Sequence, residues 1–486
     1  MSADALIIAY LAVLLLLAVY GFHRSHLVYL YFRHRRNLPV PAREFAEHEL
    51  PVVTVQLPMF NEMYVVERLL DAVARIDYPH DRLEIQVLDD STDETTEIAR
   101  RKIAALRDKA PGLDIQYLHR TDRTGFKAGA LEAGVKVARG EFLLIFDADF
   151  VPTADIVRRT IHHFSDPGVG MVQVRWEHVN RDYSRLTEVQ ALMLDGHFVI
   201  EHAGRARAGR FFNFNGTAGI WRRQAITDAG GWHHETLTED MDLSYRAQLR
   251  GWKFVYLPDI VAPAELPMEM ASFKSQQFRW AKGSIQVARK LLPQIFRARL
   301  PFKVKLEAFF HLTNNFAYPL LLLLSLLLLP NLLVRTRHGM REVLLIDLPL
   351  FLGTTLSIAS FYITSQREIR PLDWKRSLKR LPLVMSVGIG LCINQTRAVF
   401  EAMFGHESEF VRTPKHGVRE RFEHWTQRRY RAAKSLTPFV ELGLALYFVV
   451  AIGFAARGGH WVSVPFLLLF LVGYAYVGVL SVHQRR

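Results

Sequence analysis

The stretch Leu83-Glu84-Ile85-Gln86-Val87-Leu88-Asp89-Asp90-Ser91-Thr92-Asp93 decides the fold. Its first half is rich in branched apolar residues, which predicts a β-strand. The strand stops at two adjacent carboxylates, and the Ser-Thr-Asp that follows favours the start of a helix. Ligands of open α/β sheets lie just beyond the carboxyl ends of the strands, so Asp89 and Asp90 are expected at a binding site. Helix capping alone would also explain the run.

Composition points to a membrane protein with a basic soluble part. The chain has 486 residues, of which 50% are apolar, and a net charge of +13. Its Lys and Arg residues gather beside apolar segments, as the positive-inside rule expects, which argues against nucleic acid as a partner. Cys392 is the only cysteine, so an intrachain disulfide and a cysteine-rich metal site are excluded.

Between residues 51 and 299 no apolar run is long enough to span a bilayer. Strand and helix patterns alternate there, which predicts a mostly parallel sheet covered by helices. The predicted strands are residues 52–57, 83–88, 114–118, 142–146, 169–176 and 253–257, and the predicted helices are 62–74, a helix ending at 106, and 129–138. A basic amphipathic helix over 272–296 is expected to lie in the membrane interface.

Long apolar segments flank this region. Ala5–Phe22 can cross a bilayer. It could be a signal peptide, but it lacks a positive segment before it and a small-residue cleavage site after it. Further spans are predicted at 309–334, 343–363, 436–455 and 462–480.

Residues 381–404 form an ambiguous segment because they include Asn394, Arg397 and Glu401, which are costly in hydrocarbon. The basic stretch that follows belongs in the cytoplasm, so we expect 381–404 to be interfacial or re-entrant. The prediction is five spans with the α/β domain and the C-terminus cytoplasmic. The domains are then 1–36, a helix and its basic flank; 50–300, the α/β domain with its interfacial helix; and 301–486, the membrane domain, with a cytoplasmic loop at 406–434.

Three further motifs carry candidate chemistry. Asp147 and Asp149 follow the predicted strand 142–146 and can share a divalent cation whose shell is completed by phosphates. Thr238-Glu239-Asp240 offers a carboxylate for general base catalysis, although a helix cap is the alternative. In Gln276-Gln277-Phe278-Arg279-Trp280 the guanidinium suits phosphate oxygens and the indole suits a sugar face, although a Trp anchor in the interface would look the same.

In this order, Asp89-Asp90, Asp147-x-Asp149, Thr238-Glu239-Asp240 and Gln276-x-x-Arg279-Trp280 resemble the signature of the processive family 2 glycosyltransferases, which include cellulose, chitin and hyaluronan synthases. The chain is most similar to the cellulose-synthase-like enzymes that make glucomannan or xyloglucan backbones, through residues 56–62, 86–93, 125–131, 214–221 and 239–243. The resemblance implies a GT-A-type, Rossmann-like cytoplasmic α/β domain inserted in an α-helical multi-pass membrane domain.

The resemblance also implies roles for individual residues. For the donor nucleotide and its diphosphate, they are Pro58, Glu62, Asp89, Asp90, Lys127, Asp147 and Arg279. Asp147 and Asp149 would hold Mg²⁺ or Mn²⁺, with Asp149 contacting the diphosphate through the metal. Asp240, beside Glu239, would be the base, and Gln276 and Trp280 would bind the acceptor. Phe410-Val411-Arg412-Thr413-Pro414-Lys415 resembles the gating loop of cellulose synthases, in which Thr413 and Lys415 would reach the diphosphate. Arg412 stands where that family has valine.

The implied function is inverting, processive transfer from a nucleotide sugar, with UDP-glucose as the expected donor. The product would be a β-1,4-linked polysaccharide, cellulose-like or another glucan. The growing polysaccharide would be the acceptor, and it would be exported across the plasma membrane (the inner membrane of a bacterium). One alternative is a mannan or glucomannan synthase that uses GDP-mannose, and another is a non-processive polyprenyl-phosphate glycosyltransferase. A transporter or scaffold with a nucleotide-binding domain is the alternative from another class. The lipid bilayer is a partner in each case, no regulatory domain is expected after the last span, and the sequence names no export partner.

Overall fold

The computed structural model describes residues 2–338, 344–406, 412–418 and 435–484, and its centre is a mixed seven-stranded sheet. The strand order is β3-β2-β1-β4-β6-β5-β7. The strands are β1 (Val53–Met59), β2 (Leu83–Asp89), β3 (Asp114–His119), β4 (Phe142–Ile145), β5 (Val169–His178), β6 (Gly219–Arg222) and β7 (Lys253–Ala264).

Strand direction brings several strand ends to one rim. β1 pairs in parallel with β2 and β4, and β2 with β3. β6 is antiparallel to both β4 and β5, and β5 is parallel to β7. Therefore β1, β2, β3, β4, β5 and β7 all end on the same side. Their carboxyl ends form what we call the sheet rim.

Both faces of the sheet are packed. Leu143 and Ile145 belong to one apolar core, and Phe142 and Leu144 to the other, as alternation along a strand requires. The helices of this domain are α2 (Val66–Val73), α3 (Thr95–Lys109), α4 (Phe126–Val137), α5 (Ile156–Ile161), α8 (Arg223–Asp228) and α9 (Glu239–Leu249). Both sides of the sheet are therefore covered, and the rim stays available for a site.

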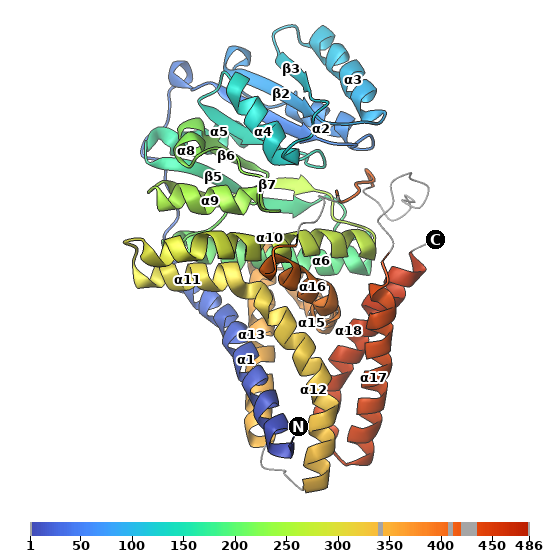
Figure 1. Cartoon of the computed structure of the whole chain (residues 1–486). Helices are drawn as coiled ribbons and strands as arrows, with labels where there is room; N and C mark the ends of the chain where they lie inside the picture. The colour runs from blue at the N-terminus through green and yellow to red at the C-terminus, as the bar shows by residue number, and fades with distance from the viewer. Residues whose placement is uncertain (1, 339–343, 407–411, 419–434, 485–486) are drawn as a thin grey trace.

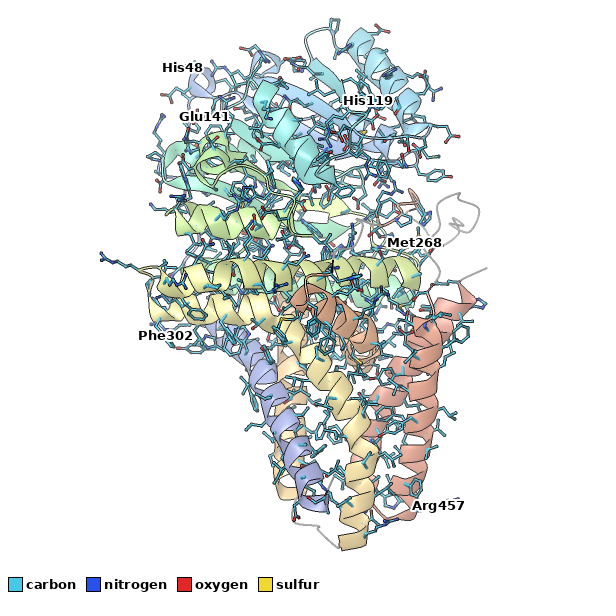
Figure 2. The ribbon with its side chains drawn as sticks, viewed as in Figure 1. His48, His119, Glu141, Met268, Phe302 and Arg457 are labelled. Atoms are coloured by element: carbon cyan, nitrogen blue, oxygen red, sulfur yellow. The ribbon has the colours of Figure 1, made fainter. Side chains whose placement is uncertain are left out.

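A layer of crosswise helices separates the sheet from a bundle of long helices (Figure 1). It contains α6 (Arg185–Gly196), α10 (Met270–Arg297) and α11 (Phe302–Thr313), and α6 continues through a π-helix (His197–His202) into α7 (Ala203–Arg207). Side chains fill the space between the layers. Phe302 lies in this middle layer, whereas Arg457 lies at the far end of the bundle (Figure 2). Short 3₁₀ turns occur at Glu47–Glu49, His80–Arg82, His162–Ser165, Asn314–Phe316 and Trp461–Ser463.

Within the described residues, five helical stretches are long and apolar enough to cross a membrane, which agrees with the predicted number. They are Ala3–Arg33, Phe302–Arg337, Asp347–Ile369, Thr437–Arg457 and Trp461–His483. The corresponding helices are α1 (Ala3–Arg33), α12 (Ala317–His338), α13 (Leu344–Ile369), α17 (Thr437–Arg457) and α18 (Val464–His483), with the short α14 (Trp374–Leu378) after α13.

The ambiguous segment 381–404 forms two helices, α15 (Leu381–Gly390) and α16 (Cys392–Met403), bent by 44°. Such a pair fits a broken span as well as a re-entrant loop, so its placement stays a prediction. Of the expected loop 406–434, residues 407–411 and 419–434 lie outside the described part of the chain, and Phe410 and Val411 are among them.

Candidate active site

Acidic residues follow the ends of four parallel strands at the sheet rim. Glu62 comes after β1, Asp89 ends β2, Asp149 follows β4 and Glu265 follows β7. The first three were predicted site residues, whereas Glu265 was not predicted. Its predicted strand ended at residue 257, whereas β7 continues to Ala264 after a register shift opposite Val174 and Arg175.

The Asp89 and Asp90 carboxylates are bonded inside the protein. Asp89 is 0% exposed and accepts hydrogen bonds from the Ser91 amide (2.9 Å), the Thr96 hydroxyl (3.0 Å) and the Tyr117 hydroxyl (2.6 Å). Asp90 accepts two hydrogen bonds from the Arg120 guanidinium, at 2.9 and 2.6 Å. The pair therefore fixes the loops at the end of β2 and shapes the wall of the site, and Asp89 presents no carboxylate oxygen without a partner.

Two other residues that were predicted to lie near the nucleotide belong to β1 or to the loop after it. Pro58 is a buried member of the strand itself, whereas Glu62 stands beyond its end. Burial raises the pKa of the Glu62 carboxyl to about 8, although Arg412, 3.4 Å away, opposes the shift. Glu62 thus meets the segment Arg412–Val418, which returns to the rim from the membrane part of the chain.

Lys127 joins the Asp147 side of the rim to the loop before β6. Its ammonium donates to Asp147 Oδ1 and, at 2.8 Å, to the carbonyl oxygen of Gly216. Gly216 has φ +80°, and a Cβ there would lie 3.1 Å from Asp240 Oδ2. The glycine therefore allows Asp240 to stand close to Lys127 and Asp147.

Glu239 and Asp240 begin α9, and Asp240 Oδ1 accepts a hydrogen bond from the Met241 amide (2.8 Å). Burial, and then the adjacent Glu239, raises the pKa of Asp240 to about 8. Burial raises the pKa of Glu239 as well, while Lys127 opposes the change. A carboxylate with a pKa near neutrality is suited to accept a proton from a hydroxyl group.

Gln276, Arg279 and Trp280 lie on α10, directly below the sheet domain (Figure 1). Spacings of three and four residues put them on one face of the helix. Arg279 donates a 2.6 Å hydrogen bond to the Thr413 hydroxyl. Burial lowers the pKa of Arg279 to about 10, so it remains a cation at neutral pH.

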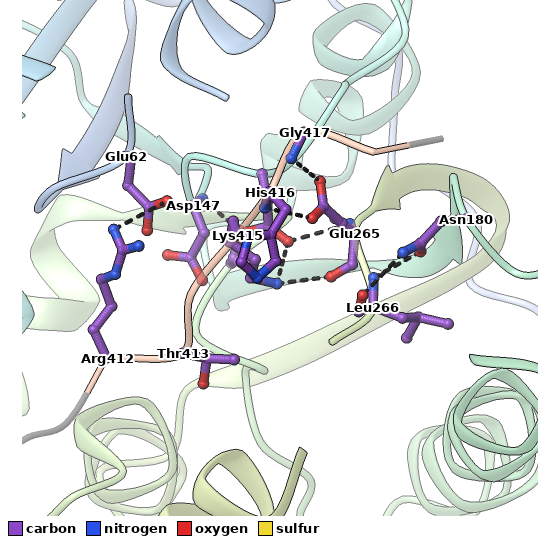
Figure 3. A network of polar contacts seen from close by, with 12 residues as sticks. Glu62, Asp147, Asn180, Glu265, Leu266, Arg412, Thr413, Lys415, His416 and Gly417 are labelled. Atoms are coloured by element: carbon purple, nitrogen blue, oxygen red, sulfur yellow. Dashed lines mark hydrogen bonds and ion pairs between the residues drawn. The ribbon is translucent and has the colours of Figure 1, made fainter. Parts of the chain in front are cut away.

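Lys415 is the residue of the returning segment that reaches the acidic rim (Figure 3). Its ammonium lies 2.6 Å from Asp149 Oδ2 and 2.7 Å from the Glu265 carbonyl oxygen. Thr413, through Arg279, and Lys415, through Asp149, are thus both held beside the sheet rim. The structure therefore gathers residues from the sheet, α10 and the segment after α16.

Asp147 and Asp149 fit a divalent cation of the Mg²⁺ or Mn²⁺ type. Among the described residues, no three His, Cys, Asp or Glu side chains cluster into a complete metal cage. Mg²⁺ usually takes one or two carboxylates and completes its shell with water and substrate phosphates, so two aspartates are sufficient. Each aspartate forms an ion pair with a lysine: Asp147 pairs with Lys127, and Asp149 pairs with Lys415.

Comparisons with known proteins agree on the class of the α/β domain. Residues 51–283 match the family described as "Glycosyltransferase like family 2". Glucomannan 4-beta-mannosyltransferase 2 of Arabidopsis thaliana is 45% identical over 258 residues, which is 52% of this chain and 48% of that protein. Glucomannan 4-beta-mannosyltransferase 1 of Oryza sativa subsp. japonica is 44% identical over 292 residues, 58% of this chain and 55% of that protein. The chain thus spans about half the length of these curated relatives.

A solved structure supports the fold. The mannosyltransferase PcManGT from Pyrobaculum calidifontis, in complex with GDP-Man and Mn²⁺, aligns with a TM-score of 0.53 at 21% identity. The alignment covers 82% of this chain and all of that one. Together with the family match, this confirms the predicted GT-A-type α/β fold.

Proposed function

Residues 51–283 match glycosyltransferase family 2, and from that premise we propose that this chain is a membrane-bound, inverting mannosyltransferase. It transfers mannose from GDP-mannose to the end of a β-1,4-linked mannan or glucomannan. The enzyme is processive, and it acts at the cytoplasmic face of a plasma membrane (the inner membrane of a bacterium).

The donor differs from the one that the sequence analysis expected. UDP-glucose was its main expectation and GDP-mannose its alternative. Both relatives named above are 4-β-mannosyltransferases at 44–45% identity, which favours the alternative. GDP-mannose is therefore the proposed donor, and UDP-glucose is the competing donor in the test.

One observation carries the proposal: Asp240, with a pKa raised to about 8, shares the rim with the Lys127–Asp147 pair. Asp240 accepts the proton of the acceptor hydroxyl, while the departing diphosphate leaves on the Asp147 side. Glu239 keeps Asp240 basic through like-charge repulsion. The transition state resembles an oxocarbenium ion, as in glycoside hydrolysis.

The remaining site residues hold the leaving group and the acceptor. Arg279 stabilises charge on the departing diphosphate by a fixed cation, the kind of preorganised electrostatics that lowers a barrier by several kcal/mol. Asp147 and Asp149 would hold a divalent cation, which would supply Lewis acid stabilisation of the departing diphosphate. Trp280 and Gln276 bind the terminal sugar of the acceptor.

The arrangement of the layers supports export of the product. α10 lies between the rim and the bundle, and Lys282 of α10 forms a 2.9 Å ion pair with Glu401 of α16. A polymer extended beneath Trp280 would therefore start at the membrane interface. Residues 1–36 and 301–486 then form the membrane domain, and 50–300 the catalytic domain.

The test is incorporation by the purified full-length protein in lipid nanodiscs, with radiolabelled GDP-mannose or UDP-glucose and Mg²⁺ or Mn²⁺. We expect a long product from GDP-mannose that an endo-β-1,4-mannanase degrades. Incorporation from UDP-glucose alone, with a product sensitive to cellulase, would contradict the donor. A short product that partitions into organic solvent would indicate the polyprenyl-phosphate alternative, and nucleotide binding without product would indicate a binding protein.

A further inference from the structure

Lys415 has the surroundings of a bound cation. Its ammonium contacts a carboxylate oxygen of Asp149 at 2.6 Å and the main-chain carbonyl oxygen of Glu265 at 2.7 Å. The Glu265 amide donates to the same Asp149 oxygen at 3.2 Å. Carboxylate and carbonyl oxygens are also the ligands that hard divalent cations take in proteins.

The carboxylate of Glu265 anchors the chain next to Lys415 (Figure 3). Its two oxygens accept hydrogen bonds from the amides of His416 (2.8 Å) and Gly417 (3.0 Å). Arg68, 3.5 Å away, balances its charge. Gly417 has φ +71°, and a Cβ there would lie 2.6 Å from the carbonyl oxygen of Tyr64, so this close approach requires glycine.

The other end of the segment is held as well. Arg412 donates a 2.8 Å hydrogen bond to the carbonyl oxygen of Phe60, and Thr413 accepts one from Arg279. Val418 is fully buried. Residues 412–418 are therefore fixed on both sides of Lys415, and the ammonium is directed at Asp149 by contacts that do not involve Lys415 itself.

We propose that Lys415 is a built-in substitute for the divalent cation. Before the donor binds, its ammonium takes the place at Asp149 that the metal later occupies, and Glu265 is the positioning residue that holds it there. The proposal rests on the metal site assigned above. A divalent cation at the Asp149 carboxylate would repel the Lys415 ammonium, which lies 2.6 Å from Oδ2, so binding of the metal with its donor is expected to displace Lys415. A buried acidic rim thereby stays neutralised between turnovers.

The test measures Mn²⁺ binding to the full-length protein in nanodiscs without any nucleotide sugar, from the electron paramagnetic resonance signal of free Mn²⁺. A hydrogen bond to a charged group contributes about 1.5–3 kcal/mol, so Lys415→Met should tighten Mn²⁺ binding by about tenfold or more. Adding Asp149→Asn to Lys415→Met should abolish the gain. The matched control is Lys102→Met, because Lys102 makes a 2.6 Å pair with Asp71 away from the rim; it should leave Mn²⁺ affinity unchanged.

Glu265→Gln tests the positioning role with Lys415 intact. It should raise Mn²⁺ affinity in the same direction as Lys415→Met, and the two changes together should give no more than Lys415→Met alone. Unchanged or weaker Mn²⁺ binding in Lys415→Met would overturn the proposal, as would a gain that survives Asp149→Asn. Since no sugar is present, this result is independent of whether GDP-mannose is the donor.

Discussion

Replacing Asp240 with asparagine is the sharpest test of the proposed chemistry. The amide keeps the shape of the carboxylate, and its oxygen can still accept the hydrogen bond from the Met241 amide. It cannot accept a proton from the acceptor. General base catalysis contributes roughly 10²–10⁴-fold, so kcat should fall by that factor, equivalent to about 3–5 kcal/mol of barrier.

The pH profile gives the same test a second readout. Burial and Glu239 raise the pKa of Asp240 to about 8, so below this pH the carboxyl group is protonated in the free enzyme and cannot act as a base. For the parent enzyme, kcat/KM should therefore increase with pH and level off above about 8. The residual activity of Asp240→Asn should lack this ascending limb.

The effect of Asp240→Asn on kcat is measured by incorporation of radiolabelled mannose. Its effect on nucleotide binding is measured separately by fluorescence titration. Binding should change little, because Asp240 acts on the acceptor. The control is Glu235→Gln, the same isosteric change at an exposed carboxylate that pairs with Lys290 at 2.9 Å; its kcat should match the parent. Polymer synthesis at the parental rate by Asp240→Asn, or an unchanged ascending limb, would refute the assignment of the base.

Further predictions concern the metal and two buried polar contacts. Treatment with EDTA should abolish mannose incorporation and Mn²⁺ should restore it; full activity after EDTA would contradict a metal role for the aspartates. Tyr117→Phe removes one of the three hydrogen bonds to buried Asp89 and should lower stability by about 1–3 kcal/mol, seen as a lower thermal midpoint. Glu401→Gln removes the carboxylate partner of Lys282, which is 0% exposed, and should lower the free energy of unfolding by about 3 kcal/mol. An unchanged thermal midpoint would show that this ion pair does not join α10 to α16.

Much of the sheet could be predicted because strand patterns are local. The run of apolar residues before Asp89 specifies β2, and a similar run before Asp147 specifies β4. Parallel strands share an edge, so the sequence alone indicated that the acidic residues after them lie near one another. It could not indicate that Asp89 is enclosed by Ser91, Thr96 and Tyr117, since those bonds depend on loop geometry.

Other parts of the fold left no usable pattern. β6 has only four residues, and its partners β4 and β5 are distant in sequence, so periodicity could not reveal it. The π-helix at 197–202 follows α6 without a break in composition. Pro258 and Asp259 disrupt the alternation in β7, which made the strand appear to end there. Because the strand continues beyond this irregularity, Glu265 reaches the rim without a sequence signal.

The contact between Lys415 and Asp149 shows where inference from sequence reaches its limit. The two residues are 266 positions apart, and no local periodicity relates them. The charge rule for membrane segments did place residues 406–434 on the same side as the sheet domain, and the direction of β4 placed Asp149 at an open edge. These two arguments bring both residues into one compartment but do not bring them into contact. The contact itself depends on Glu265, whose carboxylate accepts hydrogen bonds from the amides of His416 and Gly417, next to Lys415. A mutation of Glu265 should therefore affect metal binding more than folding.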